Sequence, residues 1–397
     1  MWFGTVWKPL LLEIKIPKEQ PKPMRAMEAM LVALHGAIYN TPDWWEKNIT
    51  GEPQTSLKFE IVSIDGKIHF YLRCFAEYRE QVEAAIYSQF PEAEIEAAAM
   101  DYCRALPADI PNKHWDFIGW DYKMTKKPQY PIPTYTAYEE KNIEEEEVVD
   151  PFNALMEGMS SLKSGEQMWI QISASPIYFS EKKGEDFVKA AHRERDILSK
   201  RIDEKKNNLK PLWQELLEFI ISGPKTEEEK EPEMFPAELR LTAGERELVE
   251  AVEKKATKPL FHCYIRNMYV ARNDSFVGEN FRLLLNYFNH FTSSEANSIW
   301  VWSKTLTKIS LSPIPFLNDL APRRKYMKKR HLIRHYRDRL NYCNPWSDAR
   351  GKKDSDIVLN VEELATLFHF PSHAVSPNPG ITRTEAKETV APSNLPV

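Results

Sequence analysis

The chain has 397 residues, with 53 Lys and Arg against 58 Asp and Glu, and a formal net charge of -5. Hydrophobic residues make up 42% and charged residues 28%, which is an ordinary globular composition. This length predicts two or three domains whose cores need no disulfides. The slightly acidic balance argues against a dedicated DNA-binding protein. We find neither a stretch of roughly 20 apolar residues that could span a bilayer nor a secretion signal.

The usual motifs of nucleotide, metal and hydrolytic chemistry are absent from the sequence. It contains no GxxxxGK[ST], GxGxxG, HExxH or GxSxG. The cysteines are far apart and form no CxxC pair, which favours a reducing cytosol: Cys74, Cys103, Cys263 and Cys343. We therefore expect a chain that is not an enzyme, with no catalytic residues, cofactor, metal site or small-molecule substrate. An unrecognised enzyme is the weakest alternative.

The N-terminal part predicts a β-α-β-β-α-β unit. Alternating or continuous apolar residues indicate strands, and apolar residues three and four apart indicate helices. Asp65-Gly66 favours a tight hairpin between two of these strands. The order is that of a ferredoxin-like domain, with two helices on one face of a four-stranded sheet. The predicted elements are strands at 10–16, 57–64, 67–73 and 93–97, with helices at 24–38 and 78–89.

A second domain of the same kind is predicted after an acidic linker. The overall expectation is an α+β protein with two tandem ferredoxin-like domains, a helical insertion in the second and an extended C-terminal tail. Thr242 and Glu245 have the spacing of a capping box. The predicted boundaries are 1–138 for domain 1, 139–165 for the linker and a short helix, 166–322 for domain 2 and 323–397 for the tail. Domain 1 ends in an aromatic, Pro-rich arm at 102–138. Domain 2 contains predicted strands at 168–174, 260–271 and 299–302 and the helical insertion at 184–222.

The tail begins with a strongly basic segment, which is a candidate contact for nucleic acid or anionic lipid. Clustered cations gain affinity for phosphates by releasing counterions. Apolar residues at helical spacing equally predict a solvated helix whose other face packs on a domain. The nine cations are Arg323, Arg324, Lys325, Lys328, Lys329, Arg330, Arg334, Arg337 and Arg339.

Several polar residues have both a functional and an ordinary interpretation. His331 and His335 are spaced like two metal ligands on a helix, but without a third ligand they are expected to be surface histidines. The ferredoxin-like order would also suit an RNA reader that stacks bases on His69 or Tyr71, although the required strand motif is missing. Glu60, Glu94 and Glu96 could supply an acid/base pair, but their spacing does not distinguish them from ordinary strand and turn surface, which is the expectation.

Two stretches resemble components of a secretion machine. Residues 356–371 are similar to the junction that precedes the motor in HerA/FtsK-like (TraG-type) ATPases of conjugation and type IV secretion. Residues 12–19, 59–66 and 87–95 are similar to uncharacterised type IV secretion-related proteins of candidate-phyla bacteria (Patescibacteria). Since the Walker lysine is missing, the resemblance implies an accessory or N-terminal module without ATP hydrolysis.

The resemblance implies that the chain docks on a separately encoded hexameric HerA/FtsK-like ATPase. It implies a cytoplasmic location at the inner face of the membrane, with peripheral membrane contact and DNA as further partners. The predicted docking residues lie in the tail, which is expected to fold against its partner: Glu363, Leu364, Leu367, Phe368, His369, Phe370 and Pro371. The alternative function is a nucleic-acid-binding module that uses the basic segment 323–339.

Overall fold

The computed structural model describes residues 8–16, 23–38, 55–136, 151–199, 241–308, 315–340 and 357–371. The chain forms two compact units. The larger unit contains Met1–Pro128, Ile132–Ile177 and Pro259–Val397, and the smaller contains Gln129–Pro131 and Tyr178–Lys258.

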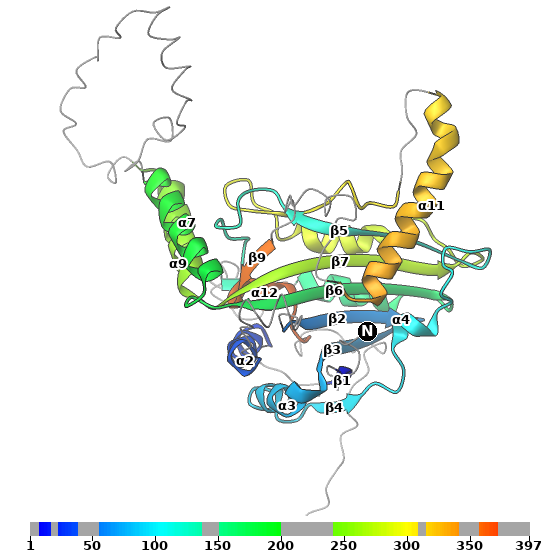
Figure 1. Cartoon of the computed structure of the whole chain (residues 1–397), viewed down its shortest axis with the longest axis horizontal. Coiled ribbons are helices and arrows are strands. Elements are labelled where there is room, and N and C mark those ends of the chain that lie inside the picture. The colour runs from blue at the N-terminus through cyan, green and yellow to red at the C-terminus, as the bar shows by residue number, and fades with distance from the viewer. Residues whose placement is uncertain are drawn as a thin grey trace, which may run out of the picture. The chain divides into compact units, whose positions relative to one another are not determined.

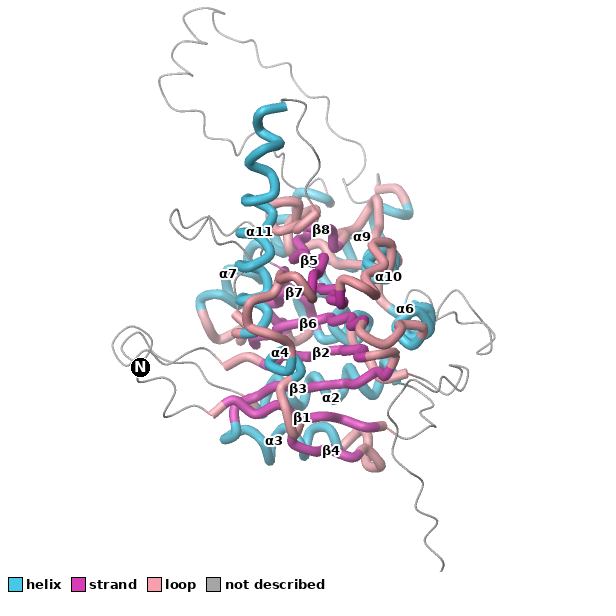
Figure 2. The backbone as a smooth tube through the Cα atoms, turned by 90° about the vertical axis from the view of Figure 1, so that its right-hand side faces the viewer, coloured by secondary structure: helices cyan, strands magenta, loops and turns pink. Residues whose placement is uncertain are grey.

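The described residues of the larger unit form an α+β structure built on one sheet of nine antiparallel strands (Figure 1). The strand order is β4-β1-β3-β2-β6-β7-β5-β8, which can be followed from bottom to top in Figure 2, and β9 pairs with β7. The strands are β1 Pro9–Lys15, β2 Leu57–Ile64, β3 Lys67–Phe75, β4 Glu94–Ala97, β5 Trp115–Met124, β6 Glu166–Ile177, β7 Leu260–Arg272, β8 Ile299–Val301 and β9 Ile357–Asn360.

The first four strands and their two helices follow the predicted β-α-β-β-α-β order along the chain. In the sheet these strands lie in the order β4-β1-β3-β2. Helix α2, Pro23–Ala37, connects β1 to β2, and α3, Arg79–Tyr87, connects β3 to β4. The predicted hairpin is confirmed, because Asp65 and Gly66 have φ angles of 52° and 80° and Ile64 pairs with Lys67. Both turn residues thus have the positive φ that a two-residue hairpin needs.

The second half of the sheet repeats this spatial order. In chain order its strands are β5, β6, β7 and β8, and in space they lie as β8-β5-β7-β6. The expectation of an extended arm at 102–138 is wrong for β5, which pairs with β7 along Trp115–Asp121. Bulky aromatics and a glycine hid its alternation in the sequence. Helices α6, Pro151–Ser160, and α10, Phe281–Asn289, follow β5 and β7.

The two faces of the sheet carry different cores. Alternate strand residues such as Phe59, Ile170 and Ile265 join α2, α3, α6 and α10 in the larger apolar cluster. The opposite face carries a smaller cluster that includes Val62, Trp169 and Tyr336. In Figure 2, α6 and α10 lie on one side of the sheet and α11 on the other.

Helix α11, Pro315–Arg337, contains much of the basic segment and packs on the sheet with the short helix α4, Tyr102–Ala105. Leu332, Ile333 and Tyr336 are its buried apolar residues. The predicted boundary at 322/323 therefore falls inside one helix, and the basic segment belongs to the larger unit. None of the helices in the described residues combines the length and apolar character needed to cross a membrane.

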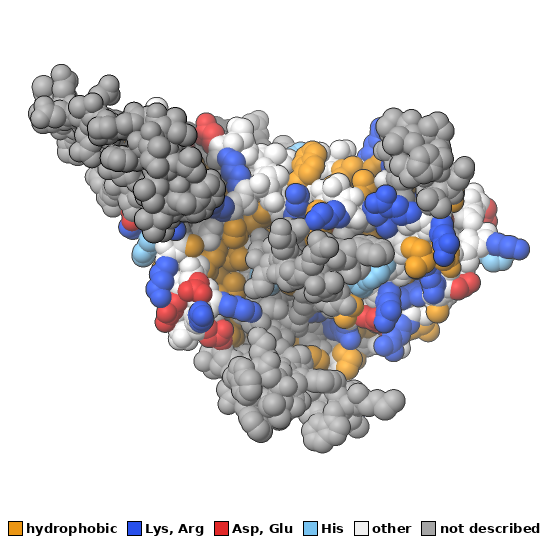
Figure 3. Space-filling model, turned by 45° about the horizontal axis from the view of Figure 1, so that its top comes forward, with side chains coloured by type: hydrophobic (Ala, Val, Ile, Leu, Met, Phe, Trp, Pro, Cys, Tyr) orange, Lys and Arg blue, Asp and Glu red, His pale blue; other side chains and the backbone are white. Residues whose placement is uncertain are grey.

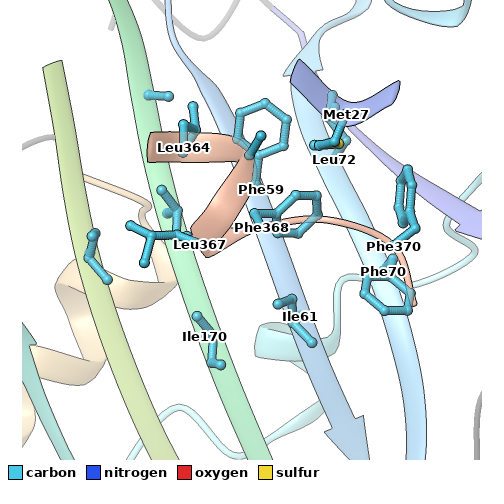
Figure 4. Packing of buried hydrophobic residues seen from close by; sticks show 14 of the residues in the cluster. Met27, Phe59, Ile61, Phe70, Leu72, Ile170, Leu364, Leu367, Phe368 and Phe370 are labelled. Atoms are coloured by element: carbon cyan, nitrogen blue, oxygen red, sulfur yellow. The ribbon is translucent and has the colours of Figure 1, made fainter. Parts of the chain in front are cut away.

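The C-terminal segment 357–371, formed by β9, α12 Val361–Leu367 and the residues after it, lies in the core of the larger unit. Every residue of this segment is buried. The ring of Phe368 lies 5.1 Å from that of Phe59, and the ring of Phe370 lies 5.5 Å from that of Phe70 (Figure 4). Phe370 also lies 5.0 Å from Phe90. The expectation that this part of the tail folds only against a partner is corrected, because its own sheet supplies the apolar surface.

The smaller unit is a helical pair inserted between β6 and β7. Helix α7, Lys182–Leu198, packs on α9, Ala243–Thr257. The predicted capping box is confirmed, since Thr242 and Glu245 each accept a hydrogen bond from the other's backbone N–H. The predicted insertion 184–222 matches α7 in part, and its continuation after residue 199 lies outside the described residues.

We expect Phe370→Ala to lower the free energy of unfolding by about 3–5 kcal/mol, since it removes a ring that is fully buried between Phe70 and Phe90. Tyr326→Ala is the matched control, because Tyr326 is 47% exposed and its loss should change stability by about 0.5 kcal/mol or less. Urea unfolding of both variants measures the difference. Equal stabilities for the two would contradict burial of the C-terminal segment.

Candidate functional site: the charged sheet face and helix α11

Polar side chains form a row across the face of the sheet that carries α11. The strand register places Tyr71, Glu60, Gln171, Arg266 and Asp121 side by side on five adjacent strands. Glu60 and Asp121 are completely buried, and Arg266 is 1% exposed. Since buried charges are costly unless they are paired, each must have a partner of opposite charge.

Glu60 pairs with Arg339, which follows α11. Arg339 donates from Nε to Glu60 Oε1 at 2.5 Å and from Nη2 to Oε2 at 2.9 Å, and Nη1 reaches Asp101 at 2.7 Å. Burial opposes the charged form of Arg339, but the Glu60 carboxylate outweighs it and raises the pKa of the guanidinium. The expectation of an ordinary surface position for Glu60 is wrong, because α11 covers this strand.

A second buried pair lies next to the first. Arg266 donates to Asp121 at 2.8 Å, and these side chains are 1% and 0% exposed. The Arg266 guanidinium also donates to the carbonyl oxygen of His335 in α11 at 3.3 Å. The two arginines therefore hold the C-terminal part of α11 against β2, β7 and β5.

Aromatic rings fill the space around these pairs. Tyr71 stacks on Tyr102 at 5.5 Å, and Trp169 lies 5.0 Å from Tyr102 and 5.3 Å from Tyr336. Tyr102 also donates to Glu60 Oε2 at 2.8 Å. Tyr71 is only 6% exposed, so base stacking of the RNA-reader kind would have to compete with Tyr102 for this ring.

The nine candidate cations of the basic segment differ in how the body of the larger unit holds them. Four of these cations donate to other parts of the larger unit. Lys329 donates to the carboxylate of Asp116 at 2.5 Å, and Arg339 donates to those of Glu60 and Asp101. Arg330 donates to the backbone carbonyls of Ala108 and Ile110, and Arg337 to those of Cys103, Leu106 and Pro107. Lys328 is half-buried. The exposed set is Arg323, Arg324, Lys325 and Arg334.

Helix α11 extends beyond the sheet before Lys329. Residues 322–327 are all exposed, and Lys329 is the first buried residue after them. Burial and the nearby Arg324 lower the pKa of Lys328. Lys and Arg side chains predominate over acidic ones on the right-hand part of the face in Figure 3.

The predicted docking residues are interior. Glu363 accepts from the backbone N–H of Ile132 and of Asn360, both at 2.8 Å, and His369 donates from Nδ1 to the Ala365 carbonyl at 3.1 Å. Leu364, Leu367, Phe368, Phe370 and Pro371 are buried with them. A partner could reach these side chains only if the core opened.

Lys58 is the buried group whose surroundings most resemble a reactive site. Burial, followed by Arg73 and Arg266, lowers its pKa well below the usual lysine value. Its Nζ donates to Ser56 and to Ser173, the latter at 2.9 Å. A neutral lysine beside a serine can serve as a general base. Here Lys58 is 6% and Ser173 1% exposed, so the pair lies out of reach of a substrate in this conformation.

The histidine pair of α11 also differs from expectation. The rings of His331 and His335 are 4.2 Å apart, and His335 is 2% exposed, so it is not a surface histidine. Among the residues that the structure describes, no three His, Cys, Asp or Glu side chains come together as a metal site.

Sequence reasoning missed the partners of the buried arginines. Asp101 follows β4, and Asp121 and Arg266 lie on strands that pair with each other. The sequence signal for these partners was a charged residue among the apolar residues of a strand. It could indicate a buried ion pair only once the pairing of strands distant in sequence was known.

Comparison with known families relates nearly the whole chain to a family model. Residues 7–381 match a family described as Domain of unknown function (DUF8128). No curated protein matches the chain.

Glu60→Gln should lower the free energy of unfolding by about 3 kcal/mol or more, because it removes the charge that pairs with a buried guanidinium. Glu279→Gln is the control, since its pair with Arg282 is exposed and should contribute about 1 kcal/mol or less. Urea denaturation gives both values. A Glu60→Gln variant as stable as its control would show that the buried pair does not hold α11.

Acid should weaken this cluster in part through Asp101. Burial raises the pKa of the Asp101 carboxyl, but the hydrogen bond from Arg339 and the charge of Arg339 together lower it by more. The pKa is therefore lower than the usual value. The resulting stability is present above the unfolded pKa of about 3.9 and is lost as pH falls through the folded value. Asp101→Asn should therefore flatten the loss of stability below about pH 4, whereas exposed Asp109→Asn should not. Denaturant unfolding as a function of pH tests this, and parallel curves for Asp101→Asn and the parent would refute it.

Proposed function

We propose that this chain, which belongs to the DUF8128 family, is a non-catalytic accessory module of a type IV secretion or conjugation-like ATPase machine. It docks on a separately encoded hexameric HerA/FtsK-like motor, in the cytoplasm at the inner face of the membrane. The resemblance of residues 356–371 to the junction before such motors motivates the choice of partner. The insertion of the smaller unit between β6 and β7 supports a role of that unit in docking to the motor.

We also propose that the two halves of the sheet are a pair of ferredoxin-like repeats. The two halves of the sheet have the same spatial order, with the fourth strand outermost, then the first, the third and the second. Their second strands, β2 and β6, pair edge to edge from Leu57↔Ala174 to Ile64↔Gln167. Duplication followed by edge pairing would explain both features and would leave each repeat with two connecting helices on one face.

The observation that carries the docking role is the point of insertion of the helical unit. Ile177 at the end of β6 pairs directly with Leu260 at the start of β7. Since antiparallel strands can be joined by a two-residue turn, the sheet does not require residues 178–259. An element that the fold does not require is a candidate for binding a partner.

The inserted unit maintains its own contacts. Ala191, Val252 and Ala256 form a small apolar cluster, and Arg195 donates to Glu253 at 3.4 Å. Tyr130 donates to Glu194 at 3.2 Å. Most other side chains along both helices are exposed or half-exposed, which offers polar surface to a partner.

Replacement of residues 178–259 by Asn-Gly should abolish binding to the motor while the sheet stays folded. The expected result is recovery of a Walker-motif ATPase with the tagged parent, after nuclease treatment, and its absence with the excised variant. Mass identification of the retained proteins measures this. Circular dichroism and the urea midpoint of the variant verify the sheet.

A matched control neutralises exposed cations elsewhere, at Lys67, Lys163 and Arg282. This control should retain the ATPase. If the folded excised variant still binds the motor, the docking role of the helical unit is refuted. Truncation before residue 323 would be uninformative, because it removes Arg339 and the buried segment 357–371 together.

A further inference from the structure

We propose that the middle part of α11, residues 322–328, binds the phosphate backbone of double-stranded DNA. This inference is independent of motor docking, which we assign to the inserted helical unit. It narrows the nine cations of the basic segment to Arg323, Arg324, Lys325 and Lys328, which lie in and beside the exposed part of the helix.

The first support is that this part of the helix projects from the larger unit. Residues 322–327 are exposed without interruption. At 3.6 residues per turn, six consecutive exposed residues leave every side of the helix open to solvent. Figures 1 and 2 both show α11 continuing beyond β5, so a large ligand can approach it from several directions.

The second support is the placement of charge around the helix. Successive residues differ by about 100° of rotation, so Arg323, Arg324 and Lys325 occupy three different sides. None of these three forms an ion pair within the described part of the chain, and no acidic residue occurs from 322 to 337. Burial, and after it the charge of Arg324, lowers the pKa of Lys328. An anion beside them would relieve this repulsion.

This distribution fits a DNA groove better than a membrane surface. A helix that lies in a lipid interface needs one continuous apolar face. Within residues 322–328, the exposed large apolar side chains are Tyr326 and Met327, and cations precede and follow them. The major groove of B-form DNA is about 12 Å wide and has phosphates on both sides, which suits a helix of about 10–12 Å diameter. In RNA duplexes this groove is too narrow.

The third support is the rigid base of the projecting part. Lys329 donates to Asp116 at 2.5 Å immediately after the exposed residues, and Arg339 is held by Glu60 and Asp101. Because the helix is already ordered, binding pays little conformational entropy. The contacts proposed are to phosphates, so affinity should be similar for unrelated DNA sequences.

The test uses the full chain and fluorescent 30-base-pair DNA duplexes of two unrelated sequences. The variant Arg323→Ser, Arg324→Ser, Lys325→Ser should bind both duplexes about tenfold or more weakly than the parent at low salt. The slope of log affinity against log salt should fall by about 2.7, at about 0.9 for each phosphate that is no longer neutralised. Unfolding midpoints of parent and variant should agree, since the three side chains are exposed.

The control variant Lys67→Ser, Lys163→Ser, Arg282→Ser removes the same charge from exposed positions outside α11 and should bind like the parent. Equally weakened binding by the two variants would assign binding to net charge and overturn the proposal. Unchanged binding by the α11 variant would also overturn it. So would capture of the parent by phosphatidylserine vesicles without measurable affinity for either duplex.

Discussion

The buried pair between Glu60 and Arg339 fixes the arrangement of one whole face of the sheet. Both Glu60 oxygens accept from the guanidinium, and neither side chain is more than 1% exposed. A charge in the middle of β2 would be unfavourable without this partner. The pair requires the end of α11 to lie over β2, which covers the aromatic rings of Tyr102 and Trp169. It also determines that the opposite end of α11 extends beyond the sheet.

The other face depends on the C-terminal segment 357–371. Its aromatic residues contact β2 and β3, while β9 pairs with β7 and Tyr287 donates to the Leu367 carbonyl at 2.8 Å. The segment therefore bridges the two halves of the sheet. A stretch that was predicted to be part of a docking tail thus contributes to the largest core.

Within the part of the chain that the structure describes, two elements offer surface to partners, and they differ in chemistry. The inserted helices α7 and α9 carry charges of both signs and form a unit of their own. Residues 322–328 of α11 carry cations without acidic residues. A protein surface suits the first element, and a polyanion suits the second. An accessory module that contacts both a motor and DNA would use the two surfaces separately.

Local structure could be predicted from the sequence, namely the Asp65-Gly66 hairpin, the first β-α-β-β-α-β order and the capping box at Thr242. Turn conformation, side-chain periodicity and helix capping depend on neighbouring residues, so they can be read along the chain. Three outcomes needed the tertiary structure: β5 pairs with a strand on each side, Glu60 is buried, and segment 357–371 belongs to the core. These outcomes depend on pairing between residues such as Glu60 and Arg339, because burial and charge compensation are set by segments that are distant in sequence.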